Sequence, residues 1–180
     1  MKRTKLIVKT KSKSYPIFFG NNLLRVAGTL IKRNLPEVKK ICIISDNKLP
    51  KAATTKLVKS LKNYKIKIYK FPVSENIKNI NFASKIVEQL LESNFNRSDC
   101  IIAFGGGIIG DLSAFISSIT KRGLKFVNIP TTLLAQVDAS IGGKTGINSI
   151  KGKNLIGTYY QPDFIISDTS LLKSLPKREM

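Results

Sequence analysis

Short apolar strands and longer amphipathic helices alternate along most of this chain. The pattern predicts strands at 5–10, 15–20, 41–45, 64–70, 100–104, 125–130 and 163–167. Apolar residues recur at helical spacing over 23–33, from about 50 to 61, over 79–93 and over 108–119. Asn21 is placed to cap the first of these helices, and a short helical piece is predicted after residue 167. Between 130 and 157 the periodicity weakens, so no element is predicted there.

The apolar strands indicate how the sheet is built. Residues 41–45 and 100–104 are almost wholly apolar, which is typical of strands buried on both faces of a parallel sheet. The alternating segment at 64–70 is expected nearer an edge, and the first two strands form a hairpin. Together these features predict a Rossmann-like α/β fold, with a doubly wound, mostly parallel sheet and an N-terminal hairpin.

Composition and charge narrow the class of protein. The chain has 180 residues, 42% of them hydrophobic, and a formal net charge of +20. Residues 1–100 carry 22 Lys and Arg against 6 Asp and Glu, but the lysines are scattered singly with few aromatics between them. We interpret the excess as a solvated surface compatible with anionic small molecules, and we expect no nucleic-acid partner. A non-enzymatic basic binding module remains the alternative that the charge alone suggests.

Cysteine and histidine usage restricts the chemistry. Cys42 and Cys100 both lie in apolar runs without a CxxC spacing, so we expect buried, reduced thiols and a cytoplasmic protein. No apolar run approaches the roughly 18 residues that cross a bilayer, so no membrane partner is expected. The sequence contains no histidine, which excludes a Ser-His-Asp triad, a His-based zinc site and imidazole acid–base catalysis within the chain.

The strongest local signal for a ligand is the glycine run in AFGGGIIGDL. Gly105, Gly106 and Gly107 follow a predicted buried strand and precede a helix, and Gly110 and Asp111 come one turn later. Backbone N–H groups and the positive end of the helix dipole can hold a phosphate there. The spacing is not the usual G-x-G-x-x-G, so a plain tight turn stays open. We place Asp111 in the first helical turn, where it either complements the dipole or meets a hydroxyl or a metal shell.

Polar residues follow two other predicted strands. Asp46 and Asn47 come after 41–45, where a dinucleotide-binding fold meets an adenosine ribose, although a turn and helix cap is the common role of such residues. Glu75 and Lys78 come after 64–70 and are expected at the same sheet edge. Taken alone, they are interpreted as a solvated ion pair.

The segment 130–157 combines glycines with isolated polar residues. Lys144 in GGKTG and Lys153 in KGKN lie among glycines, so ammonium groups and backbone amides can converge on one anion. Gln136 and Asp138 interrupt an apolar stretch just before them. A Walker A loop is excluded, because its first glycine would stand five positions before Gly143, at position 138, which is aspartate.

These motifs together resemble the 3-dehydroquinate synthase family. The resemblance rests on GGGIIGD, KRG, IPTTLLAQVDASIGGKTGIN, KGKNLIG, YQP and LKSLPKRE, and is densest from 104 to 179. It implies a lyase of the shikimate pathway that converts 3-deoxy-D-arabino-heptulosonate 7-phosphate to 3-dehydroquinate and phosphate with catalytic NAD. Another sugar-phosphate cyclase, such as 2-deoxy-scyllo-inosose synthase, remains an alternative.

The resemblance also implies roles for individual residues. Arg122 would reach the phosphate site of a neighbouring subunit, which implies a homodimer. The catalytic and substrate-binding residues would be Asp138, Lys144, Lys153, Asn154 and Arg122. The NAD-binding residues would be Asp46, Asn47, Glu75, Lys78, Gly105, Gly106, Gly107, Ile108, Ile109, Gly110, Asp111, Thr131, Thr132, Lys144, Lys153, Leu171, Leu172, Lys173 and Ser174.

The family's metal site has no counterpart in this sequence. The resemblance implies zinc or cobalt held by one glutamate and two histidines of a helical C-terminal domain, and no metal ligand is assigned here. We therefore expect residues 1–167 to form the NAD-binding domain and 168–180 to begin a helical domain that is otherwise missing. Such a chain is expected to be inactive alone.

Overall fold

The computed structural model describes residues 3–176, which form a layered α/β domain. Seven strands make one sheet in the order β1-β2-β9-β6-β5-β3-β4, and all neighbours run parallel except the β1–β2 hairpin. The strands are β1 (Arg3–Lys9), β2 (Ser14–Gly20), β3 (Lys40–Asp46), β4 (Lys65–Phe71), β5 (Cys100–Gly105), β6 (Lys125–Pro130) and β9 (Phe164–Asp168). The predicted fold class is confirmed.

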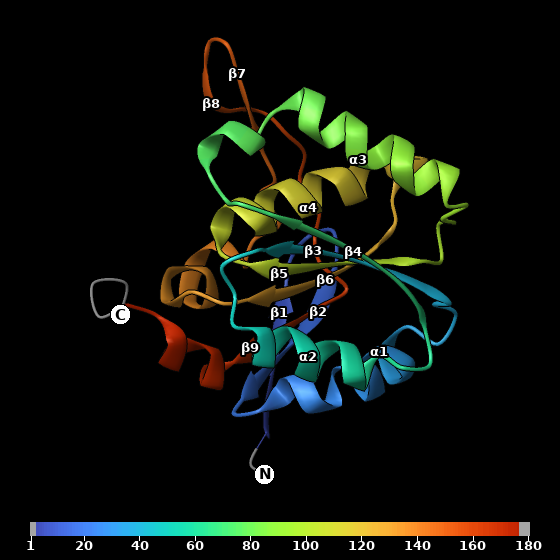
Figure 1. Cartoon of the computed structure of the whole chain (residues 1–180), viewed down its shortest axis with the longest axis vertical. Coiled ribbons are helices and arrows are strands. Elements are labelled where there is room, and N and C mark those ends of the chain that lie inside the picture. Colours follow the sequence, from blue (N-terminus) through green and yellow to red (C-terminus); the bar gives the residue numbers. More distant parts are fainter. Residues whose placement is uncertain (1–2, 177–180) are drawn as a thin grey trace.

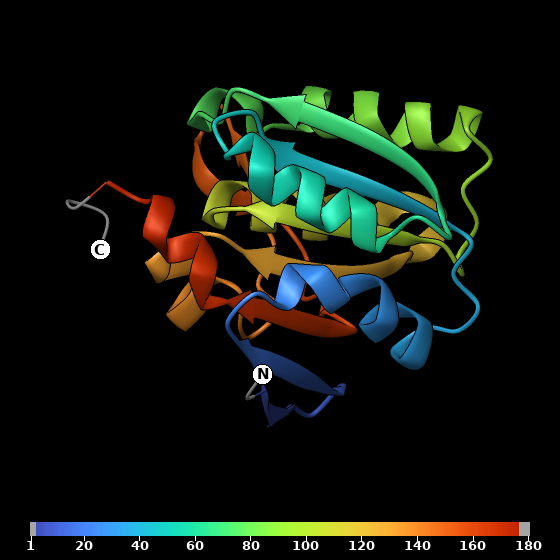
Figure 2. The ribbon, with the colours of Figure 1, turned by 60° about the horizontal axis from the view of Figure 1, so that its bottom comes forward.

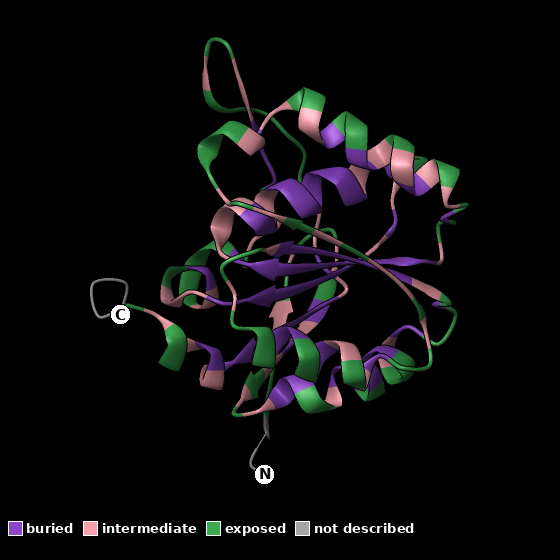
Figure 3. Cartoon of the chain, viewed as in Figure 1, coloured by how far each residue is buried: buried purple, intermediate pink, exposed green. Residues whose placement is uncertain are grey.

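Helices cover both faces of the sheet (Figures 1 and 2). On one face lie α1 (Ala27–Asn34), α2 (Lys51–Ser60) and the 3₁₀ turn η1 (Leu23–Val26), packed in one apolar cluster. On the other face lie α3 (Ile80–Glu92) and α4 (Gly107–Ile119), packed in a second cluster. Figure 3 shows the buried central strands between the two helix layers. Buried apolar residues on both faces explain why β3 and β5 lack polar alternation.

The two cysteines belong to different clusters. Cys42 of β3 is in register with Ile101, so Cys100 lies opposite Ile41 on the neighbouring strand. Successive side chains of a strand point to opposite faces, so the two thiols lie on opposite sides of the sheet. Both are free and fully buried, as predicted, and burial raises the pKa of Cys42 to about 12.

The cap of the first helical segment differs from the prediction. Asn21 does not cap it: the segment starts as a 3₁₀ turn after Asn22, whose φ is 57°. The carboxylate of Asp168, at the end of β9, accepts the backbone N–H groups of Asn22 at 2.8 Å and Leu24 at 3.0 Å. The N–H groups at the start of this segment are thus satisfied by a residue distant in sequence.

The segment between β6 and β9 contains elements that periodicity did not predict. A π-helical turn, η4 (Ala135–Ala139), is followed by a small antiparallel hairpin of β7 (Ile147–Ser149) and β8 (Gly152–Ile156). The hairpin projects beyond α4 in Figure 1. After β9, the 3₁₀ helix η5 (Thr169–Ser174) packs Leu171 into the cluster with α1 and α2. The domain boundary after residue 167 stays a prediction, and residues 177–180 of it lie outside the described part.

Within residues 3–176, no helix combines the length and the apolar character needed to span a membrane.

Candidate functional site

The carboxyl ends of the parallel strands bring several of the predicted ligand-binding residues to one edge of the sheet. β3 ends at Asp46, β5 at Gly105 and β6 at Pro130. β3 and β5 are neighbours in the sheet, but the chain leaves them toward opposite faces. The helix α2 follows β3 on one face, and α4 follows β5 on the other. Such a switch point opens a crevice in which α/β proteins hold ligands. Glu75 and Lys78 follow β4, which pairs in parallel with β3, so the expectation that they lie at the same edge as Asp46 and Asn47 is confirmed.

The glycine run lies at this switch point, between β5 and α4. Gly106 is the N-cap of α4, and Gly107 is its first residue, so the first N–H groups of a 13-residue helix face the opening. A Cβ at Gly105 would lie 2.7 Å from the side chain of Ile109. One at Gly106 would lie 3.2 Å from Cγ2 of Thr132, in the turn after β6. Close packing therefore requires glycine at position 105, and at 106 a side chain would narrow the crevice.

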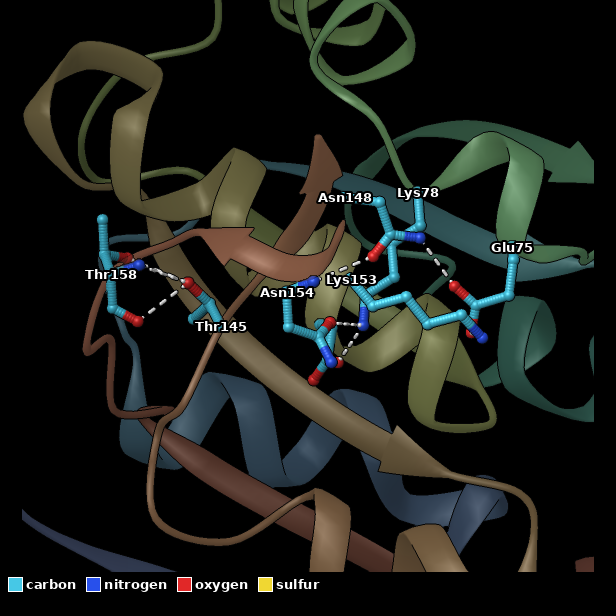
Figure 4. Close-up of polar contacts among 8 residues, drawn as sticks. Glu75, Lys78, Thr145, Asn148, Lys153, Asn154 and Thr158 are labelled. Atoms are coloured by element: carbon cyan, nitrogen blue, oxygen red, sulfur yellow. Dashed lines mark hydrogen bonds and ion pairs between the residues drawn. The ribbon is translucent and has the colours of Figure 1, made fainter. Parts of the chain in front are cut away.

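Lys78 is the centre of a buried polar cluster (Figure 4). It is only 4% exposed, and its Nζ donates to Oδ2 of Asp111 at 2.6 Å and to Oδ1 of Asn154. Asp111 lies beyond the first turn of α4, so its predicted first-turn position was wrong. Burial raises the pKa of Asp111 above its usual value, although the Lys78 ammonium opposes that shift. Three predicted residues from three different parts of the chain thus meet. The interpretation of Lys78 and Glu75 as a solvated ion pair was wrong, because Lys78 is buried and pairs with Asp111.

Glu75 has other partners, which come from the β7–β8 hairpin. Its Oε2 accepts from Nδ2 of Asn148 at 2.7 Å, and its Oε1 lies 3.8 Å from Nζ of Lys153. The Asn148 hydrogen bond is the main cause that lowers the pKa of Glu75, and the charges of Lys153 and Lys78 add to it. The hairpin is therefore fastened to η2 (Glu75–Ile77), the turn that follows β4.

A cleft of about 480 Å³ opens between α4 and the hairpin. Its lining includes Asp111, Lys144, Thr145, Gly146, Asn154, Leu155, Gly157, Thr158 and Tyr159. Lys144 and Asn154 thus share one cleft. Lys153 is exposed and turned toward Glu75 instead, so in this structure the two lysines do not converge on one point.

The base of the hairpin is held to α4 by hydroxyl groups. Oγ1 of Thr145 donates to the carbonyl of Thr158 at 2.9 Å and accepts the Thr158 N–H at 3.0 Å. Oγ1 of Thr158 donates in turn to Oγ of Ser118 on α4. A Cβ at Gly157 would lie 2.1 Å from the carbonyl oxygen of Thr145, so this close approach requires glycine. These contacts hold the base of the hairpin, and with it one wall of the cleft, against α4.

Other predicted residues lie around these two centres. Asp46 accepts the N–H of Lys48 at 2.9 Å, which is the turn-forming role left open for it, and Asn47 is exposed beside it. Asp138 is exposed on η4, and Thr131 and Thr132 follow β6. Part of η5 faces a separate hollow of about 370 Å³ beside the start of α2, lined by Leu171, Lys173 and Ser174. Leu172 is half-buried on the same turn.

Arg122 is not brought to this edge. It lies in η3 (Thr120–Arg122), before β6 begins, whereas Thr131 follows the end of that strand. A six-residue strand rises roughly 20 Å, so Arg122 is at the opposite end of the sheet. It lines another hollow there, together with Arg97, Lys125 and Asp163.

Sequence reasoning missed Asn148, Thr145, Thr158 and the role of Gln136. Nε2 of Gln136 donates to the carbonyls of Pro130 and Asp168, both at 3.1 Å, and so ties the ends of β6 and β9 together. Asn148 links Glu75 to the hairpin. A signal for Asn148 existed, since it is a polar residue four positions after Lys144 in a glycine-rich segment.

Among the described residues, no group of three or more Asp, Glu, Cys or His side chains is arranged to hold a metal ion. With no histidine in the sequence, the donor set does not fit a divalent metal site of the expected kind.

Comparisons with known proteins agree with the fold and with the motifs. The family described as "3-dehydroquinate synthase N-terminal" matches residues 68–180. The 3-dehydroquinate synthase of Pelagibacter ubique is 50% identical over 176 residues, covering 98% of this chain and 48% of that protein. That of Bartonella tribocorum is 41% identical, covering 99% of this chain and 49% of that protein. The chain spans about half the length of the curated relatives it matches.

Solved structures match as well. A 2-deoxy-scyllo-inosose synthase, crystallised with carbaglucose-6-phosphate, NAD⁺ and Co²⁺, superposes with a TM-score of 0.90 at 28% identity. The match covers 98% of this chain and 48% of that one. Glycerol dehydrogenase of Schizosaccharomyces pombe, at 21% identity and a TM-score of 0.67, shares the fold alone.

Proposed function

Because the chain belongs to the 3-dehydroquinate synthase family, we propose that it forms the cofactor side of such an enzyme and part of its substrate cleft. The reaction would convert 3-deoxy-D-arabino-heptulosonate 7-phosphate to 3-dehydroquinate and phosphate. The observation that carries the proposal is the meeting of Lys78, Asp111 and Asn154 beside the cleft, at the helix that begins at the glycine run. A cofactor bound at the start of α4 and a substrate bound in the cleft would touch the same buried cluster.

Several features at this edge of the sheet support the binding of NAD. The N-terminus of α4 offers N–H groups to a pyrophosphate, and Gly106 leaves room for it beside Thr132. Glu75 and Asp46, at the ends of adjacent strands, supply carboxylates of the kind that accept from ribose hydroxyls. The hollow beside Leu171 and Ser174 would take the rest of the dinucleotide. Bound NAD would supply reversible hydride transfer.

The cleft fits a phosphorylated sugar acid. Lys144 presents a positive charge at its wall, and the amide of Asn154 and the hydroxyl of Thr158 can bond to hydroxyl groups. Asp111 lines the cleft and is paired with Lys78, and it can exchange a proton with a hydroxyl, because burial has raised its pKa. Asp138 completes the proposed set from the adjacent turn η4. We assign no step to a metal, since the described residues do not fit one.

Arg122 supports a proposal about assembly. Because it lies at the end of the sheet opposite the cleft, it cannot serve the cleft of its own chain. We propose that it serves the phosphate site of a second copy in a homodimer. The free, buried cysteines support a cytoplasmic location for the protein.

The structural likeness to 2-deoxy-scyllo-inosose synthase favours one alternative, a related sugar-phosphate cyclase with a different substrate. Both functions require NAD, so they differ in the sugar phosphate that is turned over. Substrate assays on a completed enzyme separate them.

Isothermal titration calorimetry of the purified chain with NAD tests the proposal most directly. We expect saturable binding, because the crevice is built from this chain's own residues. A chain that gives no binding heat at about 1 mM NAD would overturn the proposed function. Joining the chain to the second half of the Pelagibacter ubique relative then allows phosphate release to be assayed with each candidate sugar phosphate. Turnover of only a hexose phosphate would select the alternative.

A further inference from the structure

Asn148 contacts three residues of the proposed site, although it has no assigned role of its own. Its Nδ2 donates to Oε2 of Glu75 at 2.7 Å, and its Oδ1 accepts the backbone N–H of Asn154 at 3.0 Å. Its own N–H donates to the carbonyl of Lys78 at 2.6 Å. A carboxylate can only accept and a backbone N–H can only donate, so this pair of partners fixes the orientation of the amide.

The hairpin is irregular at this residue. Ile147 pairs with Ile156 and Ser149 with Gly152, so one residue on β7 faces three on β8. The Asn148 side chain takes the place of the missing ladder bond by accepting from Asn154. Asn154 itself has a φ of 57°, a left-handed conformation that costs free energy unless its surroundings hold it. Irregular pairing of this kind re-aims side chains, and here Asn154 points to Lys78 while Lys153 lies toward Glu75.

We propose that Asn148 is a positioning residue that couples the cofactor loop to the substrate cleft. One side chain fixes the direction of the Glu75 carboxylate and the backbone of Asn154 together. Movement of the loop after β4 is then transmitted to the cleft wall. This inference rests on the proposed function, because it takes Glu75 and Lys78 as cofactor-binding and Asn154 as substrate-binding.

Reversing the polarity of one hydrogen bond tests the coupling. Asn148→Asp keeps the acceptor for Asn154 but loses the donor to Glu75 and places two carboxylates together. We expect it to weaken NAD binding by about fivefold in the otherwise unchanged chain. In a Glu75→Gln background the introduced amide can donate to the introduced carboxylate. Asn148→Asp should therefore weaken NAD binding by less than about twofold there. Asn63→Asp, an exposed change at the other end of the sheet, is the charge-matched control.

A second measurement does not depend on NAD. The titration of the Glu75 carboxyl, followed by NMR, reports its hydrogen bond with Asn148 directly. The charged neighbours Lys78, Lys153 and Asp111 remain in place while only Asn148 changes. Asn148→Ala should raise the pKa of Glu75 and shift the amide resonance of Asn154, with the other resonances of the sheet unmoved. Asn63→Asp should do neither.

The outcomes separate the two proposals. A wild-type chain that binds no NAD, although Glu75 responds to Asn148→Ala, would overturn the proposed function and with it the cofactor side of the coupling. Normal NAD binding with an equal penalty for Asn148→Asp in both backgrounds would overturn the positioning role alone. An unchanged Glu75 titration in Asn148→Ala would overturn it as well.

Discussion

The carboxylate of Asp111 lies 2.6 Å from Nζ of Lys78, across the gap between α4 and the loop after β4. The side chain of Lys78 is almost fully buried, and that of Asp111 is about a quarter exposed. A buried charge is costly unless it is paired, so each member makes the other tolerable. The pair also joins α4 to the loop after β4, so its loss should affect both the stability of the chain and the geometry of the proposed site.

Replacing Lys78 by Met should destabilise the chain by about 1–3 kcal/mol, because it leaves the Asp111 carboxylate partly buried and unpaired. The pKa of Asp111 is already raised, and loss of the ammonium raises it further. An unfolded carboxyl loses its proton first, so the free energy of unfolding should fall as pH rises from about 4 toward neutrality, more steeply than in the wild type. Urea titrations across that range measure this. Lys85→Met, an exposed change on α3, should show no added slope.

Asp168→Asn should also lower stability, through a different cause. The fully buried carboxylate accepts from the N–H groups of Asn22, Leu24 and Ser170 and from the Ser170 hydroxyl. An amide replaces one acceptor oxygen by a donor that faces donors, which should cost about 2–3 kcal/mol. The urea midpoint measures it, and Asp138→Asn at an exposed position is the control. Equal midpoints for the two variants would contradict the role of Asp168 as a distant cap.

Gly106→Val should abolish NAD binding while the fold persists. Position 106 has an extended backbone with φ of −77°, which valine adopts readily, so the effect comes from the side chain filling the crevice beside Thr132. Gly106→Ala, with a single methyl group, should reduce affinity by a smaller factor. Calorimetry with NAD, beside circular dichroism, checks both. If Gly106→Val binds NAD as the wild type does, the cofactor lies elsewhere.

Gly157→Ala should displace the hairpin. The new Cβ would meet the Thr145 carbonyl oxygen at 2.1 Å, and backbone cannot yield as a flexible side chain does. We expect a loss of about 2 kcal/mol or more, together with shifted amide resonances for Thr145 and Thr158. Gly146→Ala, eleven positions earlier in the same cleft, would place its Cβ at an ordinary 3.5 Å from Asn154 and should be tolerated. The comparison isolates the close approach from the mere addition of a methyl group.

The parts of this fold that were predictable from sequence are those set by local periodicity. The apolar run at 41–45 and the glycines at 105–107 identify buried strands and a helix start, and parallel strands bring their carboxyl ends to one edge. The Asp168 cap was not predictable, because a turn at residue 22 is completed by a side chain 146 positions away. The partners of Lys78 were not predictable either, because they depend on how α4 and the hairpin pack. The strands of that hairpin, of three and five residues, are too short to show a period.

The two lysines of the glycine-rich segment should prove different in function, because the structure gives them different surroundings. Lys144 lines the cleft, whereas Lys153 is exposed and lies toward the Glu75 carboxylate. In a protein completed with the second half of the Pelagibacter ubique relative, Lys144→Ala should lower kcat/KM for the sugar phosphate by about 100-fold, as expected for loss of a charge that faces a phosphate or carboxylate.

Lys153→Ala in the same completed protein should act mainly on the cofactor, weakening NAD by a few fold through Glu75 and leaving kcat at saturating NAD within about threefold. Steady-state kinetics with each ligand varied in turn separate the two effects, and Lys151→Ala, an exposed change at the hairpin turn, controls for the general loss of positive charge. Equal losses of kcat for Lys144→Ala and Lys153→Ala would mean that both ammonium groups reach the substrate during turnover. The hairpin would then have to rearrange when ligands bind, releasing Lys153 from Glu75.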